Sequence, residues 1–301
     1  TLTSFSRGSL EIDDYKFTIQ GSVSSNDMLD LTLTGENLDI AGLRKYLPEE
    51  LISKISGYNP SDLMQVNGSI KGLASRTSMP GISVFFTLNN GSISLPDNPL
   101  NINGIALEGS FTSGSGQVPS TSSITVNSFS GSLGSALYSG SLSLSNFDSL
   151  NGFIQMKGKV IPSELKEFFD IKIISSSSGS FDISVSLEGA LPEKERFSAW
   201  DLIDMEPEAD IAFNNLSIGF KNEELRLERI SGKLAVGDTV TADDLEFGFR
   251  DHRFRLEGVF RNLPAWLAGK PVILAASGKL QCDRLVPELL ISGDEDSGSG
   301  N

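Results

Sequence analysis

The chain is poor in the residues that build disulfides, metal centres and nucleic-acid surfaces. It has 301 residues, of which Cys282 is the only cysteine and His252 the only histidine. A single thiol supports neither a disulfide framework nor a cysteine-based metal site, and a single histidine excludes most histidine-rich centres. Only 24 basic residues stand against 39 acidic ones, a formal charge of −15. This balance excludes nucleic-acid binding and disfavours attraction to an anionic bilayer surface. We expect no metal and no cofactor.

Long apolar runs are also absent from the sequence. No stretch approaches the roughly 18–20 apolar residues of a membrane-spanning helix. The nearest, Trp266 to Ala276, is interrupted by Lys270 and Pro271. The first residue is threonine, which favours an excised interior fragment whose targeting segment was left out.

Apolar and polar residues alternate with period two along most of the chain. Such alternation is typical of antiparallel strands with one apolar and one wet face. Turn sequences interrupt it; they lie at residues 25–27, 67–69, 89–91, 97–99, 237–238 and 250–252. Strands of six to eight residues would be roughly 20–26 Å long. The predicted fold is mainly β: a long, curved antiparallel meander sheet, groove-like or partly closed on itself, with a few short helices.

One pattern occurs three times, at residues 31–48, 153–170 and 273–290. Each copy has an alternating strand, a glycine and a leucine-spaced helical turn, which indicates modules added side by side into one sheet. The glycines Gly35, Gly158 and Gly278 are predicted to be bulges where the strand leaves the sheet.

Short helices and polar linkers complete the predicted organisation. The helices are expected at residues 40–56, 162–169 and 283–290, with a further one near 197–205; Gly/Ser loops are expected at 112–123 and 175–180. We divide the repeat-built region 1–291 into modules 8–56, 57–170 and 171–291, followed by a disordered acidic tail, 292–301.

The few sequence motifs that suggest catalysis have simpler explanations. "SELK" at 163–166 has the Ser-x-x-Lys spacing of some serine hydrolases, but its companion motifs are missing and Ser163 is better placed as a helix cap. His252 follows Asp251 in a turn with no marked nucleophile, so a solvated turn residue is favoured. These residues predict a protein that is not an enzyme.

The aromatic composition favours an apolar face over a sugar site. There are 18 phenylalanines but only 4 tyrosines and 2 tryptophans, the rings with a polar handle that sugar sites use. With few helices to cover it, the sheet must close on itself, pack on a second sheet or hold an apolar guest. The residues that we expect to form this face are Ile82, Val84, Phe86, Leu88, Ile93, Leu95, Leu142, Leu144, Phe181, Ile183, Val185, Phe247 and Phe249.

Part of the chain resembles a known family. "VFFTLNNGSISLPDNPLNINGIALEGSF" (84–111) and "SSITVNSFSGSLGSALYSGSLSLSNFDSLNGFIQMKGKVIPSELKEFF" (122–169), with the strand-to-helix segment "DIAGLRKYLPEELISKI", resemble the C-terminal region of AsmA-like proteins. The resemblance covers most of residues 8–170 and is weaker in 171–291. It implies a groove-like periplasmic β-sheet of a Gram-negative envelope protein, anchored in the inner membrane by an N-terminal helix and associated with outer-membrane assembly and phospholipid movement.

Two functions of different class follow from these observations. The first is a non-enzymatic module that shelters the acyl chains of phospholipid or another lipid on its apolar sheet face, with other envelope assembly proteins as further partners. The alternative is a secreted or periplasmic β-sandwich that binds glycans or partner proteins. A hydrolase would need a convergent acid, base and nucleophile, which the sequence does not supply.

Overall fold

The computed structural model describes most of the chain. The described residues are 2–46, 49, 52, 58–95, 98–169, 171–172, 174–191, 205, 207–221, 225–267 and 270–284. The predicted tail, 292–301, lies outside them, as does nearly all of the predicted helices at 197–205 and 283–290.

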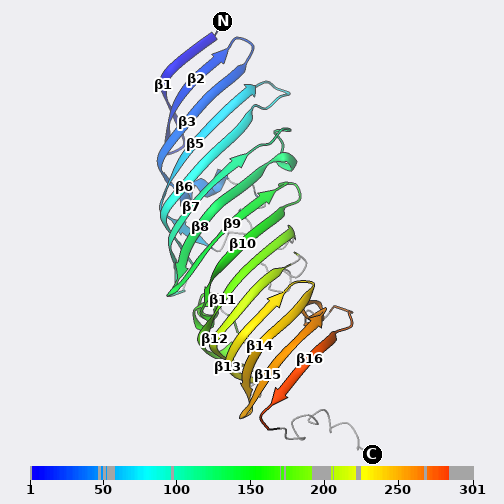
Figure 1. Cartoon of the computed structure of the whole chain (residues 1–301). Helices are drawn as coiled ribbons and strands as arrows, with labels where there is room; N and C mark the ends of the chain where they lie inside the picture. Colours follow the sequence, from blue (N-terminus) through cyan, green and yellow to red (C-terminus); the bar gives the residue numbers. More distant parts are fainter. Residues whose placement is uncertain are drawn as a thin grey trace, which may run out of the picture.

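The chain folds into one 16-stranded antiparallel sheet whose strands follow one another in chain order (Figure 1). Only β4 lies off this path and pairs with β6. The first and last strands are opposite edges of the sheet and do not pair with each other in the described part of the chain. The strands are β1 (Leu2–Ile12), β2 (Tyr15–Ser24), β3 (Met28–Asp39), β4 (Asn59–Ser61), β5 (Leu63–Leu73), β6 (Gly81–Ser94), β7 (Ile102–Thr112), β8 (Ser123–Leu133), β9 (Ala136–Ser145), β10 (Asn151–Val160), β11 (Ile174–Ala190), β12 (Glu208–Phe220), β13 (Arg226–Val236), β14 (Thr239–Phe249), β15 (His252–Arg261) and β16 (Ala275–Cys282).

The predicted fold class is therefore confirmed: a long antiparallel meander with few short helices. The described strands form a single sheet rather than two packed sheets, so the β-sandwich considered from the sequence is not the architecture here.

Most strands are longer than the six to eight residues predicted, and in three of them a predicted turn or loop sequence lies inside the strand. The sequence at 67–69 is in the middle of β5, that at 89–91 is in β6, and the Ser-rich stretch 175–180 is in the 17-residue β11. Register shifts next to Gly91 and Gly179 show that β6 and β11 absorb these glycines as bulges.

Other turn predictions are confirmed. The sequences at 25–27 and 237–238 connect β2 to β3 and β13 to β14. Between β14 and β15, Arg250 and Asp251 have φ values of 47° and 66°, the left-handed pair that a tight two-residue hairpin requires. The loop 113–122, with a short 3-10 turn at Pro119–Thr121, joins β7 to β8 as expected.

The helices are short, as predicted. These are α1 (Ile40–Leu43), continued by a 3-10 turn at Arg44–Tyr46, α3 (Pro162–Phe169) and α4 (Leu263–Leu267). The prediction for α3 is confirmed, although Ser163 is not its cap because the helix begins at Pro162, a favourable first position. Only part of the predicted 40–56 helix is described, and α4 was not predicted.

The three repeat glycines differ in role. Gly35 lies at a register shift that extends to Leu38, so the predicted bulge is confirmed there. Gly158 and Gly278 are paired in register, and the bulge prediction is wrong for both. These glycines instead allow neighbouring atoms to pack closely against the strand. A Cβ on Gly158 would lie 2.6 Å from the Tyr138 ring.

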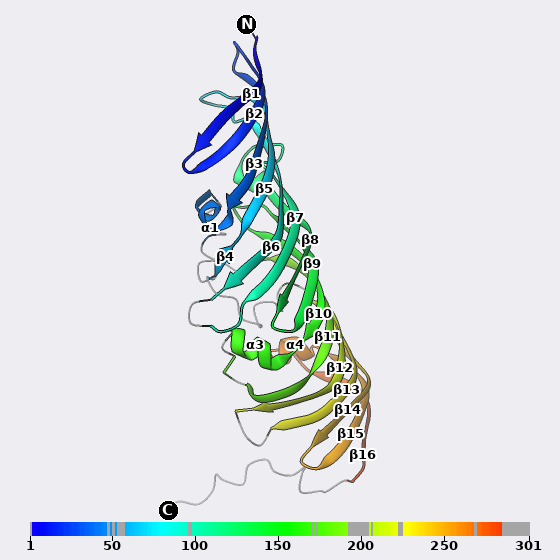
Figure 2. The same ribbon diagram turned by 90° about the vertical axis from the view of Figure 1, so that its left-hand side faces the viewer.

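One face of the sheet is apolar over its whole length. Directly paired residues share a face, and the pairings join Val84 to Phe111, Phe111 to Ile124, and Ile124 to Leu144. Further along, Ile183 pairs with Ile211. The three helices α1, α3 and α4 lie on one side of the sheet, toward which the strands curve (Figure 2).

Candidate functional site

The N-terminal half of the apolar face encloses an open hollow of about 1260 Å³, which we call the trough. Its floor is formed by β2, β3, β5, β6, β7 and β8. The floor side chains are almost all apolar: Phe17, Leu33, Leu38, Met64, Val66, Ile70, Ile82, Val84, Phe86, Ile93, Ile102, Phe111 and Ile124.

Two rims border the trough. The first rim is formed by Ile40 and Leu43 of α1 and by Arg44, which follows this helix. The Asp39 carboxylate fixes this rim by accepting hydrogen bonds from the N–H groups of Ala41 (3.3 Å) and Gly42 (3.0 Å). The second rim is formed by the 113–122 loop and by Phe147, which follows β9.

The second rim is held by an aromatic contact and by hydrogen bonds within the loop. Phe147 is buried and stacks on Phe111, with ring centroids 6.2 Å apart. The Thr121 hydroxyl donates to the Ser113 carbonyl (2.8 Å), and the Phe147 N–H donates to the Pro119 carbonyl (2.9 Å). Together these contacts attach the loop between β7 and β8 to the segment after β9.

Glycines allow the aromatic rings of the floor to lie flat against the sheet. Phe86 is paired directly with Gly109, and a Cβ built on that glycine would lie 2.6 Å from the ring. Phe17 covers Gly35 in the same way, at 2.8 Å. Each ring therefore lies over its neighbouring strand, the arrangement known as aromatic rescue of a glycine. A ring in this position occupies less of the trough than one that stands away from the sheet.

The structure brings four of the predicted face residues together in the trough: Ile82, Val84, Phe86 and Ile93. Leu88 lies on the same strand face but is only 3% exposed. Leu95, just after β6, is half-buried and does not line the trough.

Leu142 and Leu144 of β9 are half-buried and continue the apolar face beyond the trough. Leu144 pairs with Ile124, a floor residue, and Leu142 pairs with Ile154 of β10. They extend the face of the sheet without contributing to the trough itself.

The five predicted residues in the C-terminal half have different surroundings. Phe181 and Phe247 pack against a buried cluster formed by Leu216, Ile230, Ala242 and Leu245. These two predicted residues therefore belong to a packed core.

The remaining three are half-buried. Ile183 pairs with Ile211, while Val185 borders a second hollow of about 770 Å³. Phe249 is at the end of β14, and the Arg250 guanidinium lies over its ring, 5.3 Å from the ring centroid. None of the three lines the trough.

The second hollow differs chemically from the trough. It lies across β8–β14 and is lined mainly by polar or small residues, among them Ser139, Lys157, Glu208, Asp210 and Asp238. Its lining is therefore unsuitable for an apolar guest.

The helix α3 closes the apolar face beyond the trough. Its Phe168 is 1% exposed, and the Asn98 side-chain amide donates to the carbonyls of Glu167 (3.0 Å) and Phe168 (2.8 Å). At the other end of the helix, one Glu164 oxygen accepts from both the N–H and the hydroxyl of Ser135. These contacts connect α3 to the β6–β7 and β8–β9 connections.

Tyr138 is a half-buried residue close to this helix. The Tyr138 hydroxyl is inaccessible and makes no hydrogen bond within the described residues. Burial, together with the negative charge of Glu164, raises the pKa of Tyr138 above its ordinary value. The charged form is disfavoured on both grounds.

Sequence reasoning missed an entire strand of the floor. Met64, Val66 and Ile70 of β5 line the trough, and their spacing of two, four and six is a strand signal. The interpretation of 67–69 as a turn concealed it. The loop residues Val118 and Pro119 were also missed, and no periodic signal marks them.

Comparisons with family models, with curated proteins and with solved structures found no match to this chain. Among the described residues, no helix combines the length and the hydropathy needed to cross a bilayer.

Proposed function

We propose that this chain is a non-enzymatic, lipid-sheltering module of an AsmA-like envelope protein. The observation that carries the proposal is the trough: an open hollow of about 1260 Å³ with an almost entirely apolar floor. A folded protein ordinarily covers a contiguous apolar surface of this kind, and one left open marks a binding site.

The size of the trough suits acyl chains better than a small metabolite. Its volume exceeds the roughly 300–1,000 Å³ of typical small-molecule pockets. Apart from the buried Leu88, the apolar residues of β6 line the trough from Ile82 to Ile93, a span of roughly 35 Å at the usual strand rise. One acyl layer of a bilayer is about 15 Å thick, half of the hydrocarbon core. The trough is therefore long enough for a lipid tail to change position along it.

The chemistry of the floor favours weakly directional binding. Each methylene removed from water contributes about 0.8 kcal/mol, so even part of an acyl chain would be held. The floor side chains offer almost no polar group that would fix a ligand in one register. A lipid could therefore slide along the floor without breaking hydrogen bonds.

Among its described residues the rim carries one cation, Arg44, beside the carboxylates of Glu49 and Asp148, so Arg44 is the group that a phosphate would contact. The Arg44 guanidinium is half-buried at the trough and donates one hydrogen bond, 3.3 Å long, to the Tyr58 carbonyl. A guanidinium has five donors, so others remain for a phosphate. Arg44→Gln should weaken anionic phospholipid binding about 10-fold. The matched control is Lys71→Gln, which removes the same charge from an exposed ion pair with Asp30 outside the trough.

The cellular setting is part of the same proposal. The resemblance of most of residues 8–170 to AsmA-like proteins, noted from the sequence, is the ground for proposing a periplasmic module in the Gram-negative envelope, attached to the inner membrane through an N-terminal helix. The net charge of −15 is compatible with this setting, because it favours solubility without attraction to an anionic surface. Phospholipid is the proposed ligand, and outer-membrane assembly or phospholipid transport the proposed role.

The proposal is tested by native mass spectrometry and lipid extraction of the purified chain from a bacterial host. We expect phospholipid at near-stoichiometric amounts. A lipid-free monomer that also takes up no lipid from phosphatidylglycerol vesicles would refute the proposal.

A further inference from the structure

The only histidine and the only cysteine of the chain lie side by side. His252 begins β15 and Cys282 ends β16, thirty residues later. The pairing of Phe254 with Cys282 brings the two strand ends together, and Asp283 follows directly. A histidine nitrogen, the cysteine sulfur and a carboxylate oxygen lie within 4.8 Å of one another. We call these three residues the His–Cys–Asp cluster.

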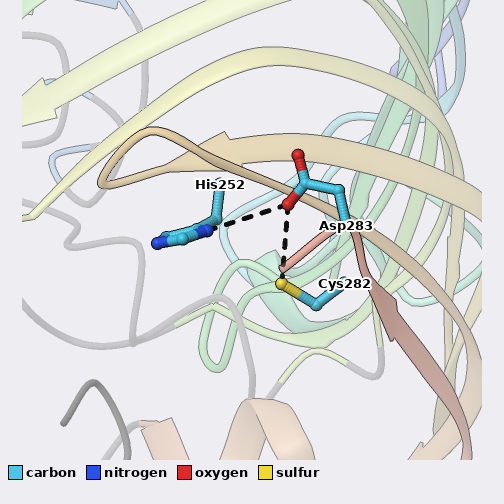
Figure 3. Close-up of side chains that lie close together, drawn as sticks. All are labelled: His252, Cys282 and Asp283. Atoms are coloured by element: carbon cyan, nitrogen blue, oxygen red, sulfur yellow. Dashed lines mark hydrogen bonds and ion pairs between the residues drawn. The ribbon is translucent and has the colours of Figure 1, made fainter. Parts of the chain in front are cut away.

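The contacts of the cluster converge on one oxygen. The Asp283 Oδ1 atom is 3.8 Å from His252 Nδ1 and 3.8 Å from Cys282 Sγ (Figure 3). The histidine was predicted to be a solvated turn residue beside Asp251. Its side chain is instead only 14% exposed and faces Asp283.

The backbone holds the carboxylate in place. The Arg253 N–H donates to Asp283 Oδ1 (3.1 Å), and the Asp283 N–H donates to the Arg253 carbonyl (3.1 Å). Such support for a carboxylate from an outer hydrogen bond is typical of metal ligands. The Cys282 thiol donates to the Arg284 carbonyl (2.9 Å).

The spacing fits a tetrahedral ion. Zinc bonds of about 2.0–2.3 Å to nitrogen, oxygen and sulfur place neighbouring ligand atoms roughly 3.3–3.6 Å apart. The two contacts of 3.8 Å would have to shorten by a few tenths of an ångström, and the His252 nitrogen and Cys282 Sγ, which lie within 4.8 Å of each other, would have to approach by up to about 1 Å, which a change of side-chain rotamer supplies. Imidazole, thiolate and carboxylate together are the donors that zinc uses in proteins, and three protein ligands leave one position for water.

We propose that His252, Cys282 and Asp283 form a binding site for a divalent zinc-type cation. On binding, the sulfur forms a bond to the metal and the thiol proton passes to solvent, while neutral His252 contributes a nitrogen lone pair and the carboxylate an oxygen. The site joins the start of β15 to the end of β16, the edge strand of the sheet. Metal binding therefore stabilises that edge by mass action. The site is independent of lipid binding in the trough.

The test is a titration of the full chain, freed of metal and kept reduced, with Zn²⁺ followed by calorimetry. We expect one zinc per chain. Cys282→Ser, His252→Gln and Asp283→Asn should each weaken binding about 100-fold, because losing a direct ligand costs at least as much as losing an outer hydrogen bond. Asparagine keeps an oxygen that accepts from the Arg253 N–H, so Asp283→Asn leaves the backbone contact intact. The double variant Glu208→Gln/Asp210→Asn, in the second hollow, is the matched control and should bind zinc like the native chain.

Co²⁺ supplies an independent measurement. It should produce a sulfur-to-cobalt absorption band in the native chain that Cys282→Ser lacks, and Zn²⁺ should raise the midpoint of thermal unfolding only when all three ligands are present. If Cys282→Ser does not fold, His252→Gln decides the question through its zinc affinity. Absence of zinc binding, or an unchanged affinity in Cys282→Ser and His252→Gln, would overturn the proposal.

Discussion

Phe85 and Phe86 are adjacent in the sequence but lie on opposite faces of β6, so they form a matched pair for testing the trough. Phe86 lines it, whereas Phe85 is outside it and 39% exposed. We predict that Phe86→Glu abolishes most lipid binding and that Phe85→Glu leaves it unchanged. Both substitutions introduce the same charge, so only the position on the sheet differs.

The magnitude follows from the surface that the Phe86 ring offers a ligand. One ring face corresponds to roughly 60 Å², about a third of what an aromatic side chain buries in a core. At 25 cal/mol per Å² this contact contributes about 1.5 kcal/mol. Placing an acyl chain against a carboxylate costs about 2 kcal/mol more through lost hydration. The sum, about 3.5 kcal/mol, is a roughly 300-fold loss of affinity.

Stability measurements separate this reasoning from a packing effect. The trough is open, so a carboxylate at position 86 stays hydrated and Phe86→Glu should cost only about 1–2 kcal/mol of unfolding free energy. An unpaired charge in a closed core would cost about 3–5 kcal/mol. Lipid binding is measured by transfer of a fluorescent phospholipid from vesicles, and stability by urea denaturation. Equal lipid affinity of Phe86→Glu and Phe85→Glu would refute the assignment of the trough as the lipid site.

Three further substitutions test the structure around the apolar face. Gly109→Ala places a methyl group 2.6 Å from the Phe86 ring; it should lower the unfolding free energy by about 1–3 kcal/mol and reduce lipid uptake, and urea denaturation with the vesicle assay checks both. Asn98→Ala removes two hydrogen bonds to the end of α3 and should cost about 1–3 kcal/mol; an unchanged denaturation midpoint would contradict this. Tyr138→Phe removes a buried, unpaired hydroxyl, so at pH 7 it should be neutral or stabilising by about 1 kcal/mol. Because the pKa of Tyr138 is raised in the folded state, native stability should fall as the pH rises above the ordinary value of 10.0, and Tyr138→Phe should lose less stability there when the two are compared by urea denaturation.

The sequence predicted the fold class because period-two alternation is a local property. Where alternation and turn chemistry agree, as at Arg250–Asp251, the prediction holds. Where glycine and asparagine occur inside an alternating run, as at 67–69, the sequence alone does not distinguish a turn from a strand. In the structure these residues belong to a strand, because β5 hydrogen-bonds to β3 on one side and to β6 on the other.

The candidate site was predicted in part. Ile82, Val84 and Phe86 share a strand, and their alternation places them on one face without further information. Whether that face is open or covered is not a local property. Phe181 lies on the same apolar face, yet it packs into a core with Leu216 of the neighbouring strand β12 and Leu245 of β14, and its own segment gives no sign of these contacts.

By itself, the sequence determined the strand periodicity, the short α3 helix, the acidic charge and the apolar side chains of the face. These follow from residue identity and near-neighbour spacing. The tertiary structure alone decided which face of β6 borders the trough, which segments form its rims and that His252 meets Cys282. Each of those depends on strand pairing between residues tens of positions apart, and the energy of such pairing is distributed over the whole sheet rather than encoded in any one segment.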